Sequence, residues 1–458
     1  MPRTIDLISP IDGSVYLTRP VVSDPEAAQM VAAVRAAQPA WAARPLAERV
    51  ALVRAAVTEV GRTTDRMAQE LAHQMGRPVR YGGEFGGFRE RAEYMADIAE
   101  TALAPVEVER SDAFVRRITR VPRGTVLVVA PWNYPYMTAI NTIAPALIAG
   151  NAVVLKHASQ TLLVGERLAE AFQAAGIPDD VFLNIVLDHD GTTGLIADGA
   201  FDAVNFTGSV EGGRAMERAA AGTFTPVYTE LGGKDPAYVM DDADLDAAVA
   251  TLIDGAMFNS GQCCCGIERI YVARPLYDAF VDKAVAAVKA YRLGDPLDPE
   301  TDIGPMAARR FAAAVRAQID AAVAAGATAH VDPFPQDDGG AYLTPQVLTG
   351  VTHEMAVMQE ESFGPVVGIM PVDTDDEAVA LMNDSRYGLT ASLWTRDLAR
   401  AEALADRIET GTVFMNRCDY LDPALCWTGC KDTGNGGGLS AIGYQNLTRP
   451  KSHHLRLP

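Results

Sequence analysis

The stretch TVLVVAPWNYP, residues 125–135, joins a short run of apolar residues to a turn bounded by prolines. Its first residues are mostly β-branched, which favours a buried strand, and the prolines end that strand. Similar runs recur at 152–155, 182–186 and 203–206, and each is followed by a stretch with helical spacing. This alternation predicts a parallel sheet covered by helices.

The segments on either side extend this prediction. Residues 24–103 carry apolar side chains at helical spacing and predict several amphipathic helices. A helix predicted over 163–175 ends at a glycine that is soon followed by a proline, which completes a βαβ unit. A second α/β region is predicted over 236–416, with helices at 245–258, 276–291 and 307–325 and β-rich runs near Ile369 and Val413.

The charge balance argues against nucleic-acid and membrane partners. Lys and Arg total 39 against 59 Asp and Glu, so the net charge of -20 repels phosphate groups. No run approaches the roughly 18 apolar residues of a membrane span, and the N-terminus does not resemble a signal peptide. The six cysteines lie in two clusters rather than in the dispersed spacing of a secreted disulfide framework. We therefore expect a cytoplasmic protein.

Three local signals carry chemistry. Residues 258–265, FNSGQCCC, place three adjacent cysteines after a helical stretch. A lone cysteine is more often a small apolar residue of the core. Three adjacent cysteines beside Gly-Gln are not all expected in the core. Glu230 precedes a pair of glycines, which lets the backbone approach another group closely. Asn133 follows the first strand, where ligands collect, and its amide can donate to a developing oxyanion.

In their order along almost the whole chain, these and other motifs resemble the aldehyde dehydrogenase superfamily. The motifs are PWNYP (131–135), VVLK (153–156), FTGS (206–209), ELGGK (230–234), GQCC (261–264), ESFGPV (361–366), WTGCKDTG (427–434) and TRPKS (448–452). The resemblance implies an α/β fold with a Rossmann-like dinucleotide-binding domain at 1–105 and 123–231 and an α/β catalytic domain at 232–438. It also implies a protruding oligomerisation segment formed by 106–122 and 439–458.

The resemblance implies the catalytic residues as well. In the family pattern the nucleophile follows Gly-Gln after one variable residue, which identifies it here as Cys264. Its thiolate would attack the carbonyl carbon of an aldehyde, with the oxyanion held by the Asn133 amide and the Cys264 N–H. Hydride would leave to NAD or NADP, and Glu230 would act as the general base that hydrolyses the resulting thioester.

The same glutamate distinguishes release of a free acid from the alternative functions. Relatives that pass the acyl group to coenzyme A generally lack this base, so Glu230 favours release of the free acid. A CoA-acylating enzyme is therefore the lesser alternative. A dinucleotide-binding paralogue without turnover is opposed by the presence of Cys264, Glu230 and Asn133 together.

No Gly-x-Gly-x-x-Gly fingerprint follows the first strand, so the dinucleotide site is placed by the resemblance alone. The pyrophosphate is expected at the start of the helix after FTGS, beside free amides of Gly208, Ser209 and Gly213. Lys156 matches the lysine on the adenosine ribose, and Glu361 matches the carboxylate on the nicotinamide ribose. The other positions expected to contact the cofactor are Trp132, Leu231 and Phe363.

Ser159 leaves the choice between NAD and NADP open. NAD-preferring relatives often carry a glutamate three residues after the ribose lysine, where it would repel a 2′-phosphate. With Ser159 there, NADP is expected to be tolerated or preferred. Alternatively, Ser159 is a neutral surface residue and NAD remains the cofactor.

The residues implied for the aldehyde tunnel are Tyr134, Met137, Asn141, Phe258, Cys263, Cys265 and Trp427. Relatives that take succinate semialdehyde place arginines at the positions of Asn141 and Phe258, so a dicarboxylic semialdehyde is less expected. Tyr134 and Trp427 match two members of the aromatic box of betaine and aminoaldehyde relatives, with Asp419 in a nearby loop. Because Asn141 replaces another tryptophan of that box, an uncharged aromatic or aliphatic aldehyde is favoured over a cationic one.

The C-terminal segment departs from the family pattern. Gly437-Gly438 replaces the common Arg-Glu, which removes a carboxylate sometimes assigned to proton exit, so Glu230 must pass protons to solvent by another route. Cys418, Cys426 and Cys430 have loose spacing and no neighbouring histidine, and their role stays open. Neither they nor the His453-His454 pair predict a metal site.

The hairpin expected at 106–122 predicts self-association. In the family this hairpin pairs with the C-terminal strand of a neighbour, and an exposed strand edge demands a partner. We therefore expect a homodimer or a homotetramer.

Overall fold

The computed structural model describes residues 3–335 and 339–458, and its first large sheet is parallel throughout. The strands of this sheet are β5 (Thr125–Val129), β6 (Ala152–Lys156), β7 (Phe182–Asn184), β8 (Ala203–Thr207) and β9 (Val227–Glu230). Their order, β7-β6-β5-β8-β9, confirms the sheet predicted from the four apolar runs. The sequence did not predict β9, because its residues VYTE mix polar with apolar side chains and do not form a continuous apolar run.

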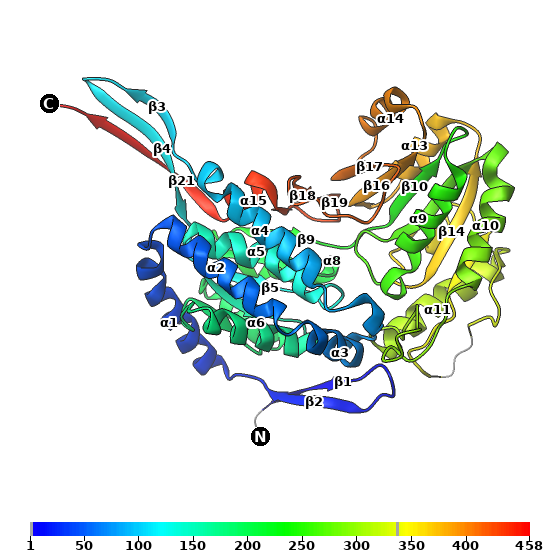
Figure 1. The fold of residues 1–458 in the computed structure, drawn as a ribbon, viewed down its shortest axis with the longest axis horizontal. Coiled ribbons are helices and arrows are strands. Elements are labelled where there is room, and N and C mark those ends of the chain that lie inside the picture. Colours follow the sequence, from blue (N-terminus) through cyan, green and yellow to red (C-terminus); the bar gives the residue numbers. More distant parts are fainter. Residues whose placement is uncertain (1–2, 336–338) are drawn as a thin grey trace.

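Helices cover both faces of this sheet (Figure 1). They are α1 (Asp24–Ala42), α2 (Leu46–Gly61), α3 (Thr64–Met75), α4 (Phe85–Ala102), α5 (Pro135–Ala149), α6 (Leu162–Ala174), α7 (His189–Ala197) and α8 (Val210–Ala220). Val126 and Val128 pack with α2, α4 and α5, whereas Leu127 and Val129 pack on the opposite side with α1. Successive strand side chains point to opposite faces, so a sheet covered on both sides needs the continuous apolar runs seen here.

The second large sheet has the order β12-β13-β14-β11-β10-β16-β17 and is parallel except between its first two strands. Its strands are β10 (Asp235–Val239), β11 (Ile267–Ala273), β12 (Thr328–Ala329), β13 (Gln346–Thr349), β14 (Val366–Val372), β16 (Thr390–Trp394) and β17 (Thr412–Met415). The helices of this region are α9 (Leu245–Met257), α10 (Tyr277–Lys289), α11 (Arg309–Ala324), α12 (Ala356–Gln359), α13 (Asp375–Asn383) and α14 (Leu398–Ala405). The predicted second α/β region is therefore confirmed.

Smaller elements complete the described chain. The β elements are β1 (Thr4–Ile8), β2 (Val15–Pro20), β3 (Val106–Arg110), β4 (Phe114–Pro122), β15 (Tyr387–Gly388), β18 (Trp427–Thr428), β19 (Cys430–Lys431), β20 (Gly437–Gly438) and β21 (Thr448–Arg456). The helical ones are α15 (Ser440–Asn446) and the 3₁₀ turns η1 (Val79–Tyr81), η2 (Ser159–Thr161), η3 (Phe258–Gly261) and η4 (Arg274–Leu276). Within the described residues, no helix is both long and apolar enough to cross a bilayer.

The protruding hairpin corrects one expectation. β3 and β4 stand out from the body, and β21 runs beside β4, with the C-terminus near their tip (Figure 1). The strand order is β21-β4-β3, so β4 pairs with the C-terminal strand of its own chain rather than with that of a neighbour. Pairing within one chain satisfies both edges of β4, and the outer edges of the three-stranded sheet belong to β3 and β21.

The topology brings the predicted site residues to neighbouring strand ends. Asn133 follows β5, Lys156 ends β6 and Glu230 ends β9, all at carboxyl ends of the first sheet. Cys264 precedes β11 of the second sheet. Because residues 231–234 connect β9 directly to β10, the two sheets meet beside Glu230.

Candidate active site

A cavity of about 330 Å³ lies where the two large sheets meet. Cys264, Glu230 and Leu231 line it, and Thr207 lines it at the end of β8. Its walls also hold all the side chains expected in the aldehyde tunnel: Tyr134, Met137, Asn141, Phe258, Cys263, Cys265 and Trp427. The structure therefore brings the expected nucleophile, base and substrate residues into one space.

The sequence did not single out several charged residues of this cavity, namely Glu90, Arg91 and Asp254. Arg91 donates from Nη1 to the Met137 carbonyl oxygen at 2.9 Å and to Asn141 Oδ1 at 3.4 Å. It lies on the buried face of α4. A charged residue on the inward face of an amphipathic helix is a signal that could have found it.

A turn with left-handed backbone leads into the cysteines. Asn259 and Ser260 have φ angles of 55° and 58°, and Gly261 follows at 69°. A Cβ at Gly261 would lie 2.2 Å from the Gly364 carbonyl oxygen, so the turn can approach this backbone only with glycine at that position.

Cys264 differs from its two neighbours in exposure and in acidity. It is half-buried, whereas Cys263 and Cys265 are buried. Hydrogen bonds from the Cys263 and Cys265 thiols lower the pKa of Cys264, although burial opposes this shift. Because the thiolate is the reactive form of cysteine, this arrangement favours Cys264 as the nucleophile.

A buried ion pair between Arg77 and Glu84 ties the walls of the cavity together. The two side chains are 3% and 2% exposed. Arg77 donates to the Asn133 carbonyl oxygen at 2.5 Å and to Asn259 Oδ1 at 3.1 Å. Glu84 Oε2 accepts two N–H groups at the start of α5, at 3.0 and 2.9 Å, where a carboxylate also complements the helix dipole.

Asn133 is bound through its backbone to the turn that precedes the cysteines. Asn259 Nδ2 donates to the carbonyl oxygens of Asn133 and Gln262, both at 3.2 Å. Asn133 is buried and, unlike its neighbour Tyr134, is not part of the cavity lining. The position of its backbone is therefore set by the same groups that set the turn.

Glu230 lies between the main cavity and a second one of about 10 Å³, which is about the size of one water molecule. Burial raises the pKa of Glu230 to about 7, and the charge of Arg91 opposes this shift. A Cβ at Gly438 would lie 2.8 Å from Glu230 Oε1. The glycine found in place of the family carboxylate therefore leaves room for the Glu230 side chain.

Polar groups line the small cavity behind Glu230. Asn205 and Tyr228 are among its lining residues, and Asn205 Nδ2 is buried without a hydrogen-bond partner. Tyr228 Oη accepts a hydrogen bond of 2.6 Å from Arg123. A water molecule in this cavity would satisfy Asn205 and contact the Glu230 carboxyl.

The residues expected on the adenosine side of a dinucleotide flank the end of β5. Lys156 is buried at the end of β6, and burial lowers its pKa. Ser159 is exposed in η2, and Ser209 caps α8 beyond β8. The chain leaves β5 toward β6 on one side and later returns to β8 on the other, and such a switch point is where open α/β sheets bind nucleotides. The residues present therefore fit a dinucleotide.

The expected free amides at the start of α8 need correction. The N–H of Gly208 donates to the Glu230 carbonyl oxygen at 3.1 Å, and that of Gly213 donates to the Ser209 carbonyl oxygen at 2.9 Å. Ser209 Oγ accepts from the N–H of Gly212. Gly213 has a packing reason to be glycine, because a Cβ there would lie 2.8 Å from the Leu231 side chain.

The residues expected around the nicotinamide lie on the loop before β14. Glu361 accepts a hydrogen bond of 3.0 Å from the N–H of Gly233, and burial, reinforced by the charge of Glu268, raises its pKa to about 8. The Phe363 ring meets the Trp132 ring edge-on, with centroids 5.4 Å apart. Of the expected cofactor residues, only Leu231 lines the main cavity.

A second buried ion pair holds this loop. Lys234 Nζ lies 2.6 Å from Glu268 Oε2, with side chains 0% and 5% exposed. Glu268 also accepts from the N–H groups of Ser362 and Phe363, at 2.7 and 2.8 Å. Arg269 is not part of the cavity lining and donates to the Lys234 carbonyl oxygen at 2.8 Å.

The aromatic side chains of the cavity do not form an open box that could bind a cationic substrate. The Arg77 guanidinium carbon lies 4.7 Å from the centroid of the Tyr134 ring, so one ring face already meets a cation. Asp419 lines the cavity, as its loop position suggested. Burial raises the pKa of Asp419 well above its ordinary range, which favours the neutral carboxyl.

The second cysteine cluster does not converge. Cys418 Sγ contacts the Thr251 carbonyl oxygen, and Cys430 Sγ contacts the Glu409 carbonyl oxygen at 3.1 Å. Cys426 is half-buried, and all three thiols are free. In the described part of the chain they form no common group that could hold a metal.

Comparisons with known proteins agree with one another. The model of the aldehyde dehydrogenase family matches residues 1–453. A succinate-semialdehyde dehydrogenase [NADP(+)] of Mycobacterium leprae is 37% identical over 80% of each chain, and one of Deinococcus radiodurans is 33% identical over 98% of this chain and 94% of the relative. The crystal structure of PnpE in complex with nicotinamide adenine dinucleotide superposes with a TM-score of 0.95 at 29% identity, over 99% of this chain and 94% of that one.

Replacing Arg77 by methionine should strongly destabilise the chain. The change leaves Glu84 buried without a partner, so we expect the free energy of unfolding to fall by about 3–5 kcal/mol. Urea denaturation followed by fluorescence measures this. The matched control is Arg62→Met, which breaks an exposed pair with Glu59 and should change stability by under about 1 kcal/mol. Equal effects of the two changes would contradict the structural role of Arg77.

Proposed function

Because this chain belongs to the aldehyde dehydrogenase family, we propose that it oxidises an aldehyde to the free carboxylic acid through a thioester on Cys264. It is an oxidoreductase that uses NAD or NADP. The observation that carries the proposal is the shared cavity, which is lined by both the half-buried Cys264 thiol and the Glu230 carboxyl.

The chemistry begins at Cys264. Its thiolate, favoured by the two neighbouring thiols, attacks the carbonyl carbon, and the resulting oxyanion accepts hydrogen bonds from the Asn133 amide and the Cys264 N–H. The tetrahedral carbon then loses hydride and becomes a thioester. Bound NAD or NADP would supply the hydride acceptor for this step.

Hydrolysis of the thioester depends on Glu230. With a pKa of about 7, half of its carboxyl groups are ionised near neutral pH and can take a proton from the attacking water. The proton then passes to the small cavity behind Glu230, where Asn205 and Tyr228 can bind a water molecule. This route would serve as the proton exit that is sometimes assigned in relatives to a carboxylate at the position of Gly438.

The ends of β5, β6 and β8 would hold the cofactor. Lys156 and Ser159 would bind the adenosine ribose, Ser209 and the start of α8 would bind the pyrophosphate, and Glu361 and Phe363 would border the nicotinamide. The five-stranded sheet and its helices, at 1–105 and 123–231, form the dinucleotide-binding domain, and 232–438 form the catalytic domain. The names of the curated relatives and the exposed, uncharged Ser159 support use of NADP.

An uncharged aromatic or aliphatic aldehyde is the substrate that the cavity supports best. Its walls are largely apolar and aromatic, with Tyr134, Phe258 and Trp427 around the thiol. Glu90 and Asp254 also line the cavity and would repel a dicarboxylic semialdehyde. Succinate semialdehyde is the second candidate, because Arg91 could bind a distal carboxylate and because the relatives carry that name.

The three-stranded sheet of β3, β4 and β21 is the proposed dimer contact. Val106 and Val108 are 56% and 57% exposed on β3, which is an edge strand of the sheet. Exposed apolar side chains beside an unpaired strand edge are typical of a surface that a second copy covers. Residues 106–122 and 448–456 therefore form the centre of a homodimer, and two such dimers would form a homotetramer.

Rapid mixing with aldehyde and cofactor, without coenzyme A, tests the mechanism. Reduced cofactor should form continuously in the native enzyme and not at all in Cys264→Ala. Glu230→Gln should release about one equivalent of reduced cofactor per site and then turn over about 10²–10⁴-fold more slowly, because acylation proceeds without the base. Glu402→Gln, on the exposed face of α14, is the control and should behave as the native enzyme.

The pH profile gives an independent readout of the same step. Burial raises the pKa of Glu230, so the carboxylate is present above about pH 7 and is lost below it. The steady-state rate should therefore rise with pH through about 7, and this rise should be absent in Glu230→Gln. A native profile that is flat between pH 6 and 8 would remove Glu230 from the hydrolysis step.

Substrate competition separates the two candidate aldehydes. We expect kcat/KM for hexanal and benzaldehyde to exceed that for succinate semialdehyde, and Arg91→Met to leave this ranking unchanged. Arg91→Lys, which retains the positive charge, accompanies it as the control. If succinate semialdehyde is preferred and Arg91→Met lowers its kcat/KM at least about tenfold without affecting hexanal, the second candidate replaces the first, since charged hydrogen bonds contribute about 1.5–3 kcal/mol.

Light scattering tests the proposed dimer. The native protein should have two or four times the mass of one chain. Val108→Lys puts a charge on the β3 edge and should produce a monomer, because lysine on an edge strand opposes pairing. Val15→Lys places the same charge on an equally exposed valine of the β1–β2 hairpin and should leave the mass unchanged. A Val108→Lys protein of native mass would place the contact elsewhere.

A further inference from the structure

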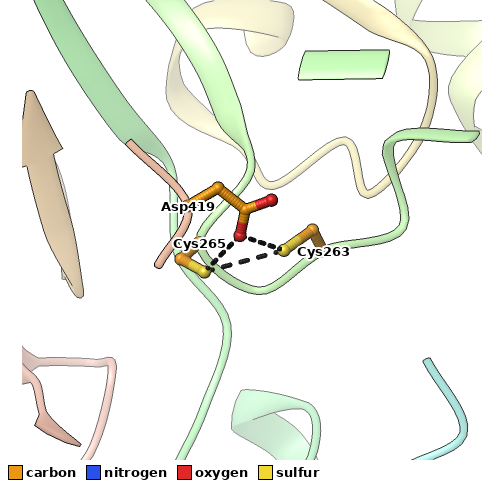
Figure 2. Close-up of side chains that lie close together, drawn as sticks. All are labelled: Cys263, Cys265 and Asp419. Atoms are coloured by element: carbon orange, nitrogen blue, oxygen red, sulfur yellow. Dashed lines mark hydrogen bonds between the residues drawn. The ribbon is translucent and has the colours of Figure 1, made fainter. Parts of the chain in front are cut away.

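The side chains of Cys263, Cys265 and Asp419 converge (Figure 2), and all three line the main cavity. The two cysteines flank the nucleophile in the sequence. Cys263 Sγ and Cys265 Sγ lie 3.6 Å apart. Asp419 Oδ1 lies 3.1 Å from the first sulfur and 3.0 Å from the second. Within the part of the chain that the structure describes, no other three Cys, His, Asp or Glu side chains form such a group.

We propose that Cys263, Cys265 and Asp419 form a binding site for a thiophilic divalent cation such as Zn²⁺. Zinc at about 2.3 Å from each of two sulfurs in a tetrahedron sets the sulfurs about 3.8 Å apart, close to the 3.6 Å found here. A carboxylate ligand at about 2.1 Å would lie about 3.6 Å from each sulfur, so Asp419 needs to move outward by only about 0.5 Å. Two sulfurs and one oxygen form three of the four ligands, and the fourth position is open.

The loop that carries Asp419 is held in place. Asp419 has a φ of 50°, a left-handed conformation that aspartate tolerates better than most residues. The preceding Cys418 is buried, and a Cβ on Gly255 of α9 would lie 2.6 Å from its sulfur. The packing of Cys418 against α9 therefore fixes where Asp419 enters the cavity. The ligand set joins residues 156 positions apart without any rearrangement of the backbone.

The charges around the cavity favour entry of a cation. Glu90, Asp254 and Glu230 line the same space as the three ligands. Arg91 is the one basic residue of this lining, and its guanidinium already donates to Met137 and Asn141. A divalent cation is thus attracted to the cavity and finds two thiols and a carboxyl at one place on its wall.

The position of the site gives it a consequence for catalysis. The thiols of Cys263 and Cys265 both lie within hydrogen-bonding reach of Cys264, so a cation bound to them stands beside the nucleophile. An aldehyde cannot then reach the thiolate. The cation would act as a reversible inhibitor that a chelator removes, a property separate from the proposed oxidation.

Cobalt binding tests the site without any turnover. Co²⁺ is added to the reduced, oxygen-free protein, and thiolate-to-cobalt charge-transfer absorption in the near ultraviolet is followed. We expect about one ion per chain, displaced by Zn²⁺. The double variant Cys263→Ser, Cys265→Ser should lose this absorption, and Asp419→Asn should weaken the affinity at least tenfold. Cys264→Ser should keep the absorption, because the nucleophile is not one of the three ligands.

The control is Cys430→Ser, which removes a thiol outside the cavity and should bind as the native protein does. No charge-transfer absorption in the native protein, absorption retained in the double variant, or absorption lost in Cys264→Ser alone would each overturn the proposal. Zn²⁺ should also inhibit aldehyde oxidation, with EDTA restoring the rate. The cobalt signal needs neither aldehyde nor cofactor, so it tests the cation site even if the protein does not oxidise aldehydes.

Discussion

The buried ion pair of Arg77 and Glu84 is the constraint on which the arrangement of the cavity depends. One guanidinium binds the backbone before α5 and the turn before the cysteines, and one carboxylate caps α5 itself. Charges out of water are costly unless every group has a partner, and here the partners are the very segments that carry Asn133 and Cys264. Because both charges need partners, Arg77 and Glu84 hold three chain segments at a fixed spacing.

The Lys234–Glu268 pair does the same on the opposite side. Lys234 belongs to the segment that joins the two sheets, and Glu268 lies on β11 just after the cysteines. Through the amides of Ser362 and Phe363, the pair fixes the loop expected to border the nicotinamide. Each large α/β region thus contains a buried ion pair that binds the segments around the cavity. Lys234 of the ELGGK motif can be charged and yet inaccessible to solvent because Glu268 is its partner.

Much of the fold could be read from the sequence, because β5 and β6 are buried on both faces and so appear as continuous apolar runs. The likeness of ordered motifs gave Cys264, Glu230 and the tunnel residues, which line one cavity, and Asn133, which does not line it. The helical spacing of α4 could have placed Arg91 on the buried face, but it could not show that Arg91 reaches Asn141, 50 positions later in the chain. The convergence of Asp419 with two cysteines was missed for the same reason.

Two expectations failed for a simpler reason, which is that backbone groups find partners nearby. The amides of Gly208 and Gly213 looked free in a glycine-rich turn, yet Glu230 and Ser209 satisfy them. β4 looked in need of a neighbour, yet β21 of the same chain pairs along its length. The roles of the site residues and the domain bounds stay predictions, since a cavity defines proximity and not chemistry.

Glu230 is the last residue of β9 in one sheet, and Cys264 lies just before β11 of the other. The proposed base and the proposed nucleophile therefore lie on opposite sides of the four-residue connection 231–234. A rotation of one body about that connection changes the separation of the two groups while leaving each sheet intact. The separation of the two groups is therefore set by how the two α/β regions pack against each other, and not by either sheet alone.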